Sequence, residues 1–210
     1  MPKTLLIIDL DGTLVDSQRD IVRTLNSTLT AMGLATIPEA EIISYVAHGI
    51  TPLVNAHYPD KANEILTKFG ALYAAESAVE STLFPGWSEA LDLLKSVKKV
   101  ILTNKPQRFT NPLVKELGIE HHFQGIYGRE AFAECKPSPV PILEILSLFS
   151  VPAREAVMIG DTDTDMLTAQ RAGVDTCAVM FGYGDNSELL ALNPTFTIKS
   201  PLELMHLISK

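Results

Sequence analysis

The stretch that decides the fold is Thr4-Leu5-Leu6-Ile7-Ile8-Asp9-Leu10-Asp11-Gly12-Thr13-Leu14-Val15-Asp16-Ser17. Its short apolar run is typical of a strand buried on both faces of a parallel sheet. Ligands of such sheets bind just beyond the carboxyl ends of the strands, so Asp9 and Asp11 are expected where chemistry is usually done. Gly12 allows the chain to bend sharply there. Because two carboxylates this close repel each other, the pair predicts a cation or a shared proton nearby.

The composition of the chain is that of a globular protein. It has 210 residues, of which 46% are hydrophobic and 20% charged, enough for one core and a modest insertion. The net charge of -8 and the absence of a Lys/Arg cluster argue against nucleic acid as a partner. An acidic enzyme can still bind an anionic substrate when a metal ion and a few placed cations reset the local field.

The cysteine content and the hydropathy pattern bear on the compartment. The two cysteines, Cys135 and Cys177, show no metal-ligand or redox spacing, so a disulfide framework is not expected and a reducing compartment fits. The apolar residues after Lys3 are interrupted at Asp9, which excludes a signal-peptide pattern. No apolar stretch approaches the roughly 20 residues that span a bilayer. The sequence predicts a soluble, cytoplasmic protein without a membrane partner.

The second part of the chain is expected to be entirely helical. Apolar residues at three- and four-residue spacings and turn signals between them predict helices over residues 20–32, 39–46, 51–56 and 61–78. No strand is expected between residues 15 and 84. A helical block of this length, placed between a first strand and the next strand–helix unit, predicts an inserted cap.

Beyond Pro85-Gly86 the pattern changes to strands that alternate with helices. Strands are expected over residues 99–103, 124–127, 156–159, 176–180 and 196–198, and helices over 87–95, 108–117, 139–149, 163–172 and 201–208. Such alternation predicts a parallel sheet with right-handed crossovers. The predicted fold class is therefore α/β: a Rossmann-like parallel sheet core flanked by helices (residues 1–14 and 84–210), with an inserted α-helical cap domain (residues 15–83).

Further polar residues fall at or just after the predicted strand ends. Thr103 is followed by Asn104 and Lys105, a later loop carries Lys136, and a fourth strand runs into Gly160-Asp161-Thr162-Asp163-Thr164-Asp165. Aspartates, a hydroxyl and a lysine that converge at one sheet edge are the groups needed for metal-assisted phosphoryl transfer.

These residues resemble the haloacid dehalogenase superfamily of phosphohydrolases. The match is to a DxDGT[LV] opening at Asp9 to Leu14, a Thr/Ser strand end at Thr103, a loop lysine at Lys136 and a GDxxxD segment from Gly160 to Asp165. All four occur in the order of the family, and the resemblance covers essentially the whole chain.

The resemblance implies a role for each of the acidic residues. Asp9 would be the nucleophile that becomes an aspartyl-phosphate. Asp11 would be the general acid and then the base that activates water. Mg²⁺ would be held by the Asp9 carboxylate, the Asp11 backbone carbonyl and Asp161. Asp165 would have a supporting role, holding Lys136 or a metal-bound water.

The remaining site residues are carried over in the same way. Thr103, Asn104 and Lys136 are expected to bind the phosphoryl group, with Gly12 and Thr13 in support. His48 is a possible substrate contact, because phosphoglycolate-type relatives often carry a VGxG turn here, although Ala47 stands where its first glycine would be. Lys105 and Arg108 are expected to be solvated positions at the start of a helix.

The presence of Asp11 narrows the reaction, because family members that displace halide lack this aspartate and the ion-pumping branch has threonine there. The sequence therefore predicts a magnesium-dependent phosphatase of carbohydrate metabolism that acts on a small phosphorylated metabolite, most similar to phosphoglycolate phosphatase. A β-phosphoglucomutase-like sugar-phosphate mutase and a pyrophosphatase are alternatives. A non-enzymatic binding module is disfavoured by the intact set of catalytic residues. The protein is expected to be a monomer or a homodimer.

Overall fold

The computed structural model describes residues 2–47, 49–76 and 78–208. Its centre is a six-stranded sheet with the order β5-β4-β1-β6-β7-β8, and all five strand pairs are parallel. The strands are β1 (Leu5–Ile8), β4 (Lys98–Leu102), β5 (Gly125–Tyr127), β6 (Ala156–Gly160), β7 (Asp175–Val179) and β8 (Phe196–Ile198). The predicted α/β fold class is confirmed.

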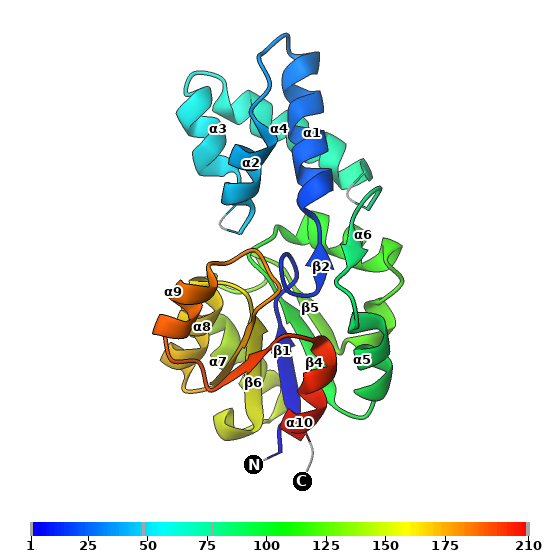
Figure 1. The fold of residues 1–210 in the computed structure, drawn as a ribbon, viewed down its shortest axis with the longest axis vertical. Helices are drawn as coiled ribbons and strands as arrows, with labels where there is room; N and C mark the ends of the chain where they lie inside the picture. The colour runs from blue at the N-terminus through cyan, green and yellow to red at the C-terminus, as the bar shows by residue number, and fades with distance from the viewer. Residues whose placement is uncertain (1, 48, 77, 209–210) are drawn as a thin grey trace.

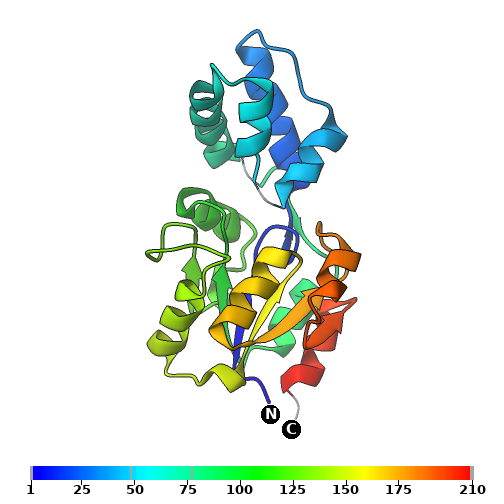
Figure 2. The same cartoon turned by 90° about the vertical axis from the view of Figure 1, so that its left-hand side faces the viewer.

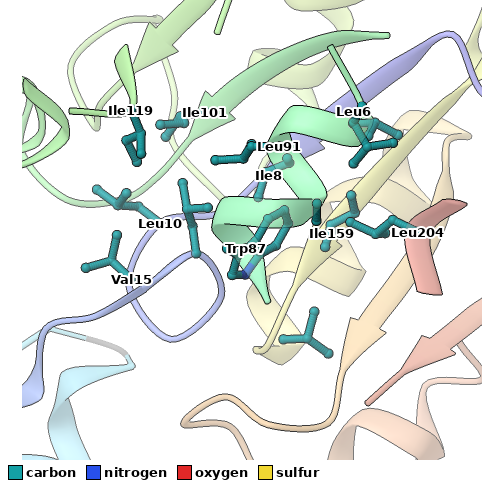
Figure 3. Close-up of a cluster of buried hydrophobic side chains, with 14 of the residues drawn as sticks. Leu6, Ile8, Leu10, Val15, Trp87, Leu91, Ile101, Ile119, Ile159 and Leu204 are labelled. Atoms are coloured by element: carbon teal, nitrogen blue, oxygen red, sulfur yellow. The ribbon is translucent and has the colours of Figure 1, made fainter. Parts of the chain in front are cut away.

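Both faces of the sheet are covered by helices, because successive residues of a strand point to opposite faces. Leu6 and Ile8 pack with Trp87 and Leu91 on one face (Figure 3), whereas Leu5 and Ile7 belong to the cluster on the other. All four β1 side chains are fully buried, each worth about 1.5–3 kcal/mol. The first face carries α5 (Trp87–Leu93) and α6 (Gln107–Glu116), and the second carries α7 (Val140–Phe149) and α8 (Asp163–Ala172).

Four helices form a separate unit at one end of the molecule (Figures 1 and 2). They are α1 (Gln18–Ala31), α2 (Glu39–Val46), α3 (Thr51–His57) and α4 (Ala62–Glu76), and they enclose an apolar cluster of their own. We call these helices the four-helix unit. The exact limits of the predicted cap, residues 15–83, stay a prediction.

Two short antiparallel strands join the four-helix unit to the sheet. They are β2 (Val15–Asp16) and β3 (Thr82–Leu83). The expectation of no strand between residues 15 and 84 was therefore wrong. Strands of two residues are too short to leave a periodic pattern in the sequence.

The C-terminal part contains a helix that was not predicted, α9 (Asn186–Ala191). Asp185 is its N-cap and accepts hydrogen bonds from the amides of Ser187 and Glu188, a start signal that the sequence does carry. The chain ends with α10 (Met205–Ile208), preceded by a 3₁₀ turn at Pro201–Leu204, with further 3₁₀ turns at Glu120–His122 and Ala153–Glu155. Among the described residues, no helix combines the length and the apolar character needed to cross a membrane.

A buried aspartate ties the start of α1 to the segment that returns to the sheet. Asp20 is fully buried, and its Oδ2 accepts hydrogen bonds from the Glu80 amide (3.0 Å), the Ser81 amide (2.7 Å) and the Ser81 hydroxyl (2.7 Å). Arg23 binds the other oxygen at 2.8 Å. Burial opposes the charge of Asp20, but the hydrogen bonds from Arg23 and Ser81 outweigh it and hold its pKa below the ordinary value.

We expect Asp20→Ala to lower the free energy of unfolding by about 2–4 kcal/mol, because it removes the acceptor for several buried donors at once. Urea denaturation measures this change. The matched control is Asp60→Ala at an exposed position near the start of α4, which should stay within about 0.5 kcal/mol of the wild type. Equal effects of the two variants would contradict the assignment.

Candidate active site

The order of the strands brings the candidate residues to one edge of the sheet. β1 lies between β4 and β6, so the loops after these three strands leave side by side. The Asp9 amide donates to the carbonyl of Ile159 in β6 at 2.9 Å, which fixes the position of Asp9 just beyond β1. Thr103 directly follows β4, and Asp161 directly follows β6.

Three buried carboxylates meet at this edge. Asp9, Asp161 and Asp165 each place a carboxylate oxygen within 4.8 Å of the others. Burial is the main cause that raises the pKa of Asp9 to about 8; Asp165 and Asp161 repel its charge further, and Lys136 opposes them. Burial and then Asp165 raise the pKa of Asp161 to about 6. The cluster therefore resists full ionisation without additional positive charge.

Lys136 lies between two of these carboxylates. Its Nζ is 2.9 Å from Asp9 Oδ1 and 2.5 Å from Asp165 Oδ1, and the residue is 4% exposed. Burial opposes its charge, but the attraction of Asp165 and Asp9 raises its pKa. Sequence reasoning expected Lys136 at this edge, and the structure places it there.

The start of α8 fixes Asp165. Asp165 Oδ2 accepts from the Thr162 amide at 3.1 Å and from the Thr162 hydroxyl at 2.7 Å, while the Asp165 amide donates back to Thr162 Oγ1 at 3.3 Å. This reciprocal arrangement is a capping box. It leaves Asp165 Oδ1 directed to Lys136, so the contact that begins the helix also orients the site.

Asp161 is held by the loop after β1 and by a loop that sequence reasoning did not include. Asp161 Oδ1 accepts from the Thr13 hydroxyl at 2.8 Å, and Oδ2 accepts from the Tyr183 amide at 2.9 Å. Gly12 has a φ of +82°, and a Cβ there would lie 2.2 Å from Asp161 Oδ2. A side chain at position 12 would therefore be both strained and in collision with Asp161.

The side chain of Asp11 lies in a different environment from that of Asp9. Lys105 Nζ is 3.0 Å from both Asp11 oxygens, and the Ser17 hydroxyl donates to Oδ1 at 2.5 Å. Lys105 also donates to Tyr73 Oη at 2.8 Å. Burial opposes the charge of Lys105, but Asp11 outweighs it and raises the pKa of the ammonium group.

The expectation that Lys105 is solvated was wrong, because this residue is only 9% exposed. The expectation is confirmed for Arg108, which is exposed. Lys105 stands two residues beyond Thr103, and this closeness to a strand end was the signal that could have placed it in the site.

The loop after β4 contacts the loop that carries Lys136. Asn104 Nδ2 donates to the Lys136 carbonyl at 2.9 Å, and the Lys105 amide donates to Thr103 Oγ1 at 3.1 Å. Asn104 Oδ1 is buried and accepts no hydrogen bond from the described residues. His48 lies outside the described residues.

The donor set fits a magnesium ion. Asp9 and Asp161 offer carboxylate oxygens, the ligands that this hard cation prefers. The three buried carboxylates can carry three negative charges, and Lys136 beside them carries one positive charge. A dication would offset the remaining negative charge.

Comparisons with known proteins agree with this geometry. The family model described as haloacid dehalogenase-like hydrolase matches residues 6–179. A phosphoglycolate phosphatase of Nitrosococcus oceani is 31% identical over 98% of this chain and 96% of its own length. One of Chromobacterium violaceum is 34% identical over 95% of this chain and 94% of its own.

A solved structure of a predicted phosphoglycolate phosphatase from Haemophilus somnus has the same fold. It superposes with a TM-score of 0.90 at 24% identity and covers 99% of this chain and 98% of its own. With the acidic cluster at the strand ends, these matches confirm the resemblance found in the sequence: the chain belongs to the haloacid dehalogenase-like hydrolases.

Proposed function

We propose that this hydrolase is a magnesium-dependent phosphatase, that it acts on a small phosphorylated metabolite through a phosphoaspartate on Asp9, and that its substrate is 2-phosphoglycolate. The observation that carries the proposal is the position of Lys136, whose Nζ lies 2.9 Å from Asp9 Oδ1 and 2.5 Å from Asp165 Oδ1. A carboxylate that attacks an anionic phosphoryl group needs such a fixed cation beside it, because the two reacting groups repel each other.

The two aspartates after β1 divide the chemistry. In the first step an Asp9 oxygen forms a bond to phosphorus while the bond from phosphorus to the leaving oxygen breaks, and Asp11 gives its proton to that oxygen. In the second step Asp11 takes a proton from water, the water oxygen bonds to phosphorus, and the bond from Asp9 to phosphorus breaks. Each step conserves charge and atoms, and the two steps together return both side chains to their first state.

The other residues bind and orient. Asp9, Asp161 and the Asp11 carbonyl would hold a magnesium ion, which neutralises charge on the phosphoryl group. Thr103, Asn104 and Lys136 would bind the phosphoryl oxygens.

The four-helix unit would serve as a cap over the site. We propose that residues 15–83 form this cap and residues 1–14 and 84–210 the catalytic core, with β2 and β3 as the hinge. Closure of such a unit excludes bulk water from the phosphoaspartate and supplies contacts to the substrate.

The choice of 2-phosphoglycolate is supported by the relatives, since proteins named phosphoglycolate phosphatase match nearly the full chain at 31% and 34% identity. The mutase and the pyrophosphatase stay the alternatives, and a comparison of substrates separates them from this choice.

We expect phosphate release from 2-phosphoglycolate to exceed that from sugar phosphates and pyrophosphate, without any bisphosphate activator. Asp9→Asn should lower kcat at least about 1,000-fold, because the amide cannot act as the nucleophile. Steady-state phosphate release measures both. Asp92→Asn at an exposed position of α5 is the control and should retain wild-type activity. Full activity of Asp9→Asn would exclude a phosphoaspartate, and a requirement for a sugar bisphosphate would favour the mutase.

Magnesium binding should be visible as a pH-dependent gain in stability. The pKa values of Asp9 and Asp161 rise from 3.8 to about 8 and about 6 on folding. Without metal, the free energy of unfolding therefore falls as pH rises from the unfolded value of 3.8 through the folded values of about 6 and about 8. We expect Mg²⁺ to raise Tm by about 5 °C at pH 8.5 and by less at pH 5.5, since a cation favours the ionised carboxylates.

Thermal denaturation in Mg²⁺ and in EDTA measures this difference. Asp161→Asn should abolish most of the shift, while Asp60→Asn, which removes one exposed charge, should preserve it. A shift of equal size in both variants would mean that the ion binds elsewhere.

A further inference from the structure

Lys105 is a buried cation to which the proposed reaction assigns no task. An ammonium group has three N–H donors, and Lys105 Nζ lies at hydrogen-bonding distance from three oxygen atoms: Asp11 Oδ1 and Oδ2 at 3.0 Å and Tyr73 Oη at 2.8 Å. The ammonium group is therefore saturated by these contacts. It holds both oxygens of the carboxylate that carries the proton in the proposed reaction.

Tyr73 connects this contact to the four-helix unit. It belongs to α4 and is 2% exposed. Its ring stacks on Phe69 with centroids 5.3 Å apart and meets the edge of Phe109, in α6, at 5.4 Å. The Tyr73 ring is thus fixed from both sides. Its hydroxyl can reach Lys105 only while α4 lies against α6.

The packing of α4 on α6 is close at this point. A Cβ at Gly70 would lie 3.2 Å from Phe109 Cζ, so glycine allows the two helices to approach. The Lys105 ammonium lies 4.7 Å from the centroid of the Tyr73 ring, as expected for a group that donates to the hydroxyl at the edge of this ring. The lysine therefore approaches the tyrosine from its hydroxyl side.

We propose that Lys105, oriented by Tyr73, is a positioning residue that fixes the Asp11 carboxylate for proton transfer and makes this transfer depend on the docking of α4. The inference rests on the proposed function, since it concerns the role of Asp11 in that reaction. A carboxylate displaced by about 1 Å from its productive position can cost about 100-fold in rate. The Ser17 hydroxyl donates to one of the two Asp11 oxygens, Oδ1, whereas Lys105 spans both oxygens and so fixes the plane of the carboxylate.

A purely structural ion pair is the alternative to be separated from this role. A buried pair contributes little net stability, because the loss of hydration offsets the attraction between the charges. Loss of such a pair would lower activity on every substrate alike. When a residue that positions a general acid is lost, the decrease in activity depends instead on how much the leaving group of each substrate needs a proton.

The test compares two small substrates with different leaving groups. The glycolate alkoxide of 2-phosphoglycolate requires protonation as it leaves, whereas acetate leaves acetyl phosphate without it. For Lys105→Met we expect kcat/KM to fall about 100-fold on 2-phosphoglycolate and less than about 5-fold on acetyl phosphate. Because kcat/KM reports the steps up to cleavage of the substrate bond, it isolates the first proton transfer.

Three further variants sharpen the comparison. Tyr73→Phe removes only the hydroxyl and should show the same selectivity with a loss of about 3- to 10-fold on 2-phosphoglycolate, so it carries the test if Lys105→Met does not fold. Lys105→Arg keeps the charge and should restore part of the activity. Lys115→Met replaces an exposed lysine on α6 and should match the wild type on both substrates.

The outcomes separate this inference from the proposed function. If the wild type is active and Lys105→Met and Tyr73→Phe each lower kcat/KM equally on both substrates, the positioning role would be overturned. The phosphatase assignment would stay intact. A wild type that releases phosphate from neither substrate would overturn the proposed function, and the role of Lys105 with it.

Discussion

The candidate site depends on the compensation of buried negative charge. Asp9, Asp161 and Asp165 bring carboxylate oxygens within 4.8 Å of one another, and charges that close repel strongly in a medium of low polarity. Lys136 reduces this repulsion by contacting two of the three. The negative charge that remains favours a further cation, and a bound metal ion would in turn attract an anionic substrate.

Ordinary backbone constraints place these charges. The Thr162–Asp165 capping box begins α8 and at the same time directs Asp165 to Lys136. A Cβ at Gly182 would lie 2.2 Å from the Asp161 Cβ and 2.4 Å from the Gly12 carbonyl, so the loop after β7 can close over Asp161 only with glycine at that position. The site is therefore built from the same contacts that end strands and begin helices.

The sequence predicts those parts of the site that follow from strand order. Asp9, Thr103 and Asp161 stand directly after apolar runs, so a parallel sheet brings them to one edge whatever the loops do. Lys105 follows the same rule but was assigned to a solvated helix start. Lys105 is buried because Tyr73 of α4 packs beside it. No local sequence pattern reveals that α4 lies against α6. Tyr183 contacts Asp161 through its backbone amide, and such a contact carries no sequence signal.

The structure also changes how the two aspartates after β1 are understood. In the sequence Asp9 and Asp11 are a repelling pair, separated only by Leu10, which is fully buried in the core (Figure 3). In the folded protein the anchored Leu10 lies between two carboxylates that contact different lysines: Asp9 meets Lys136, and Asp11 meets Lys105. The charges that raise the pKa of Asp9 are those of Asp165 and Asp161, so its close neighbour in the sequence, Asp11, is not the main source of repulsion. The demand for a dication comes instead from Asp161 and Asp165, which share Lys136 and its surroundings with Asp9. Lys136 contacts the proposed nucleophile, Asp9, and Lys105 contacts the proposed acid, Asp11. This difference in surroundings allows two neighbouring carboxylates to take different parts in one reaction.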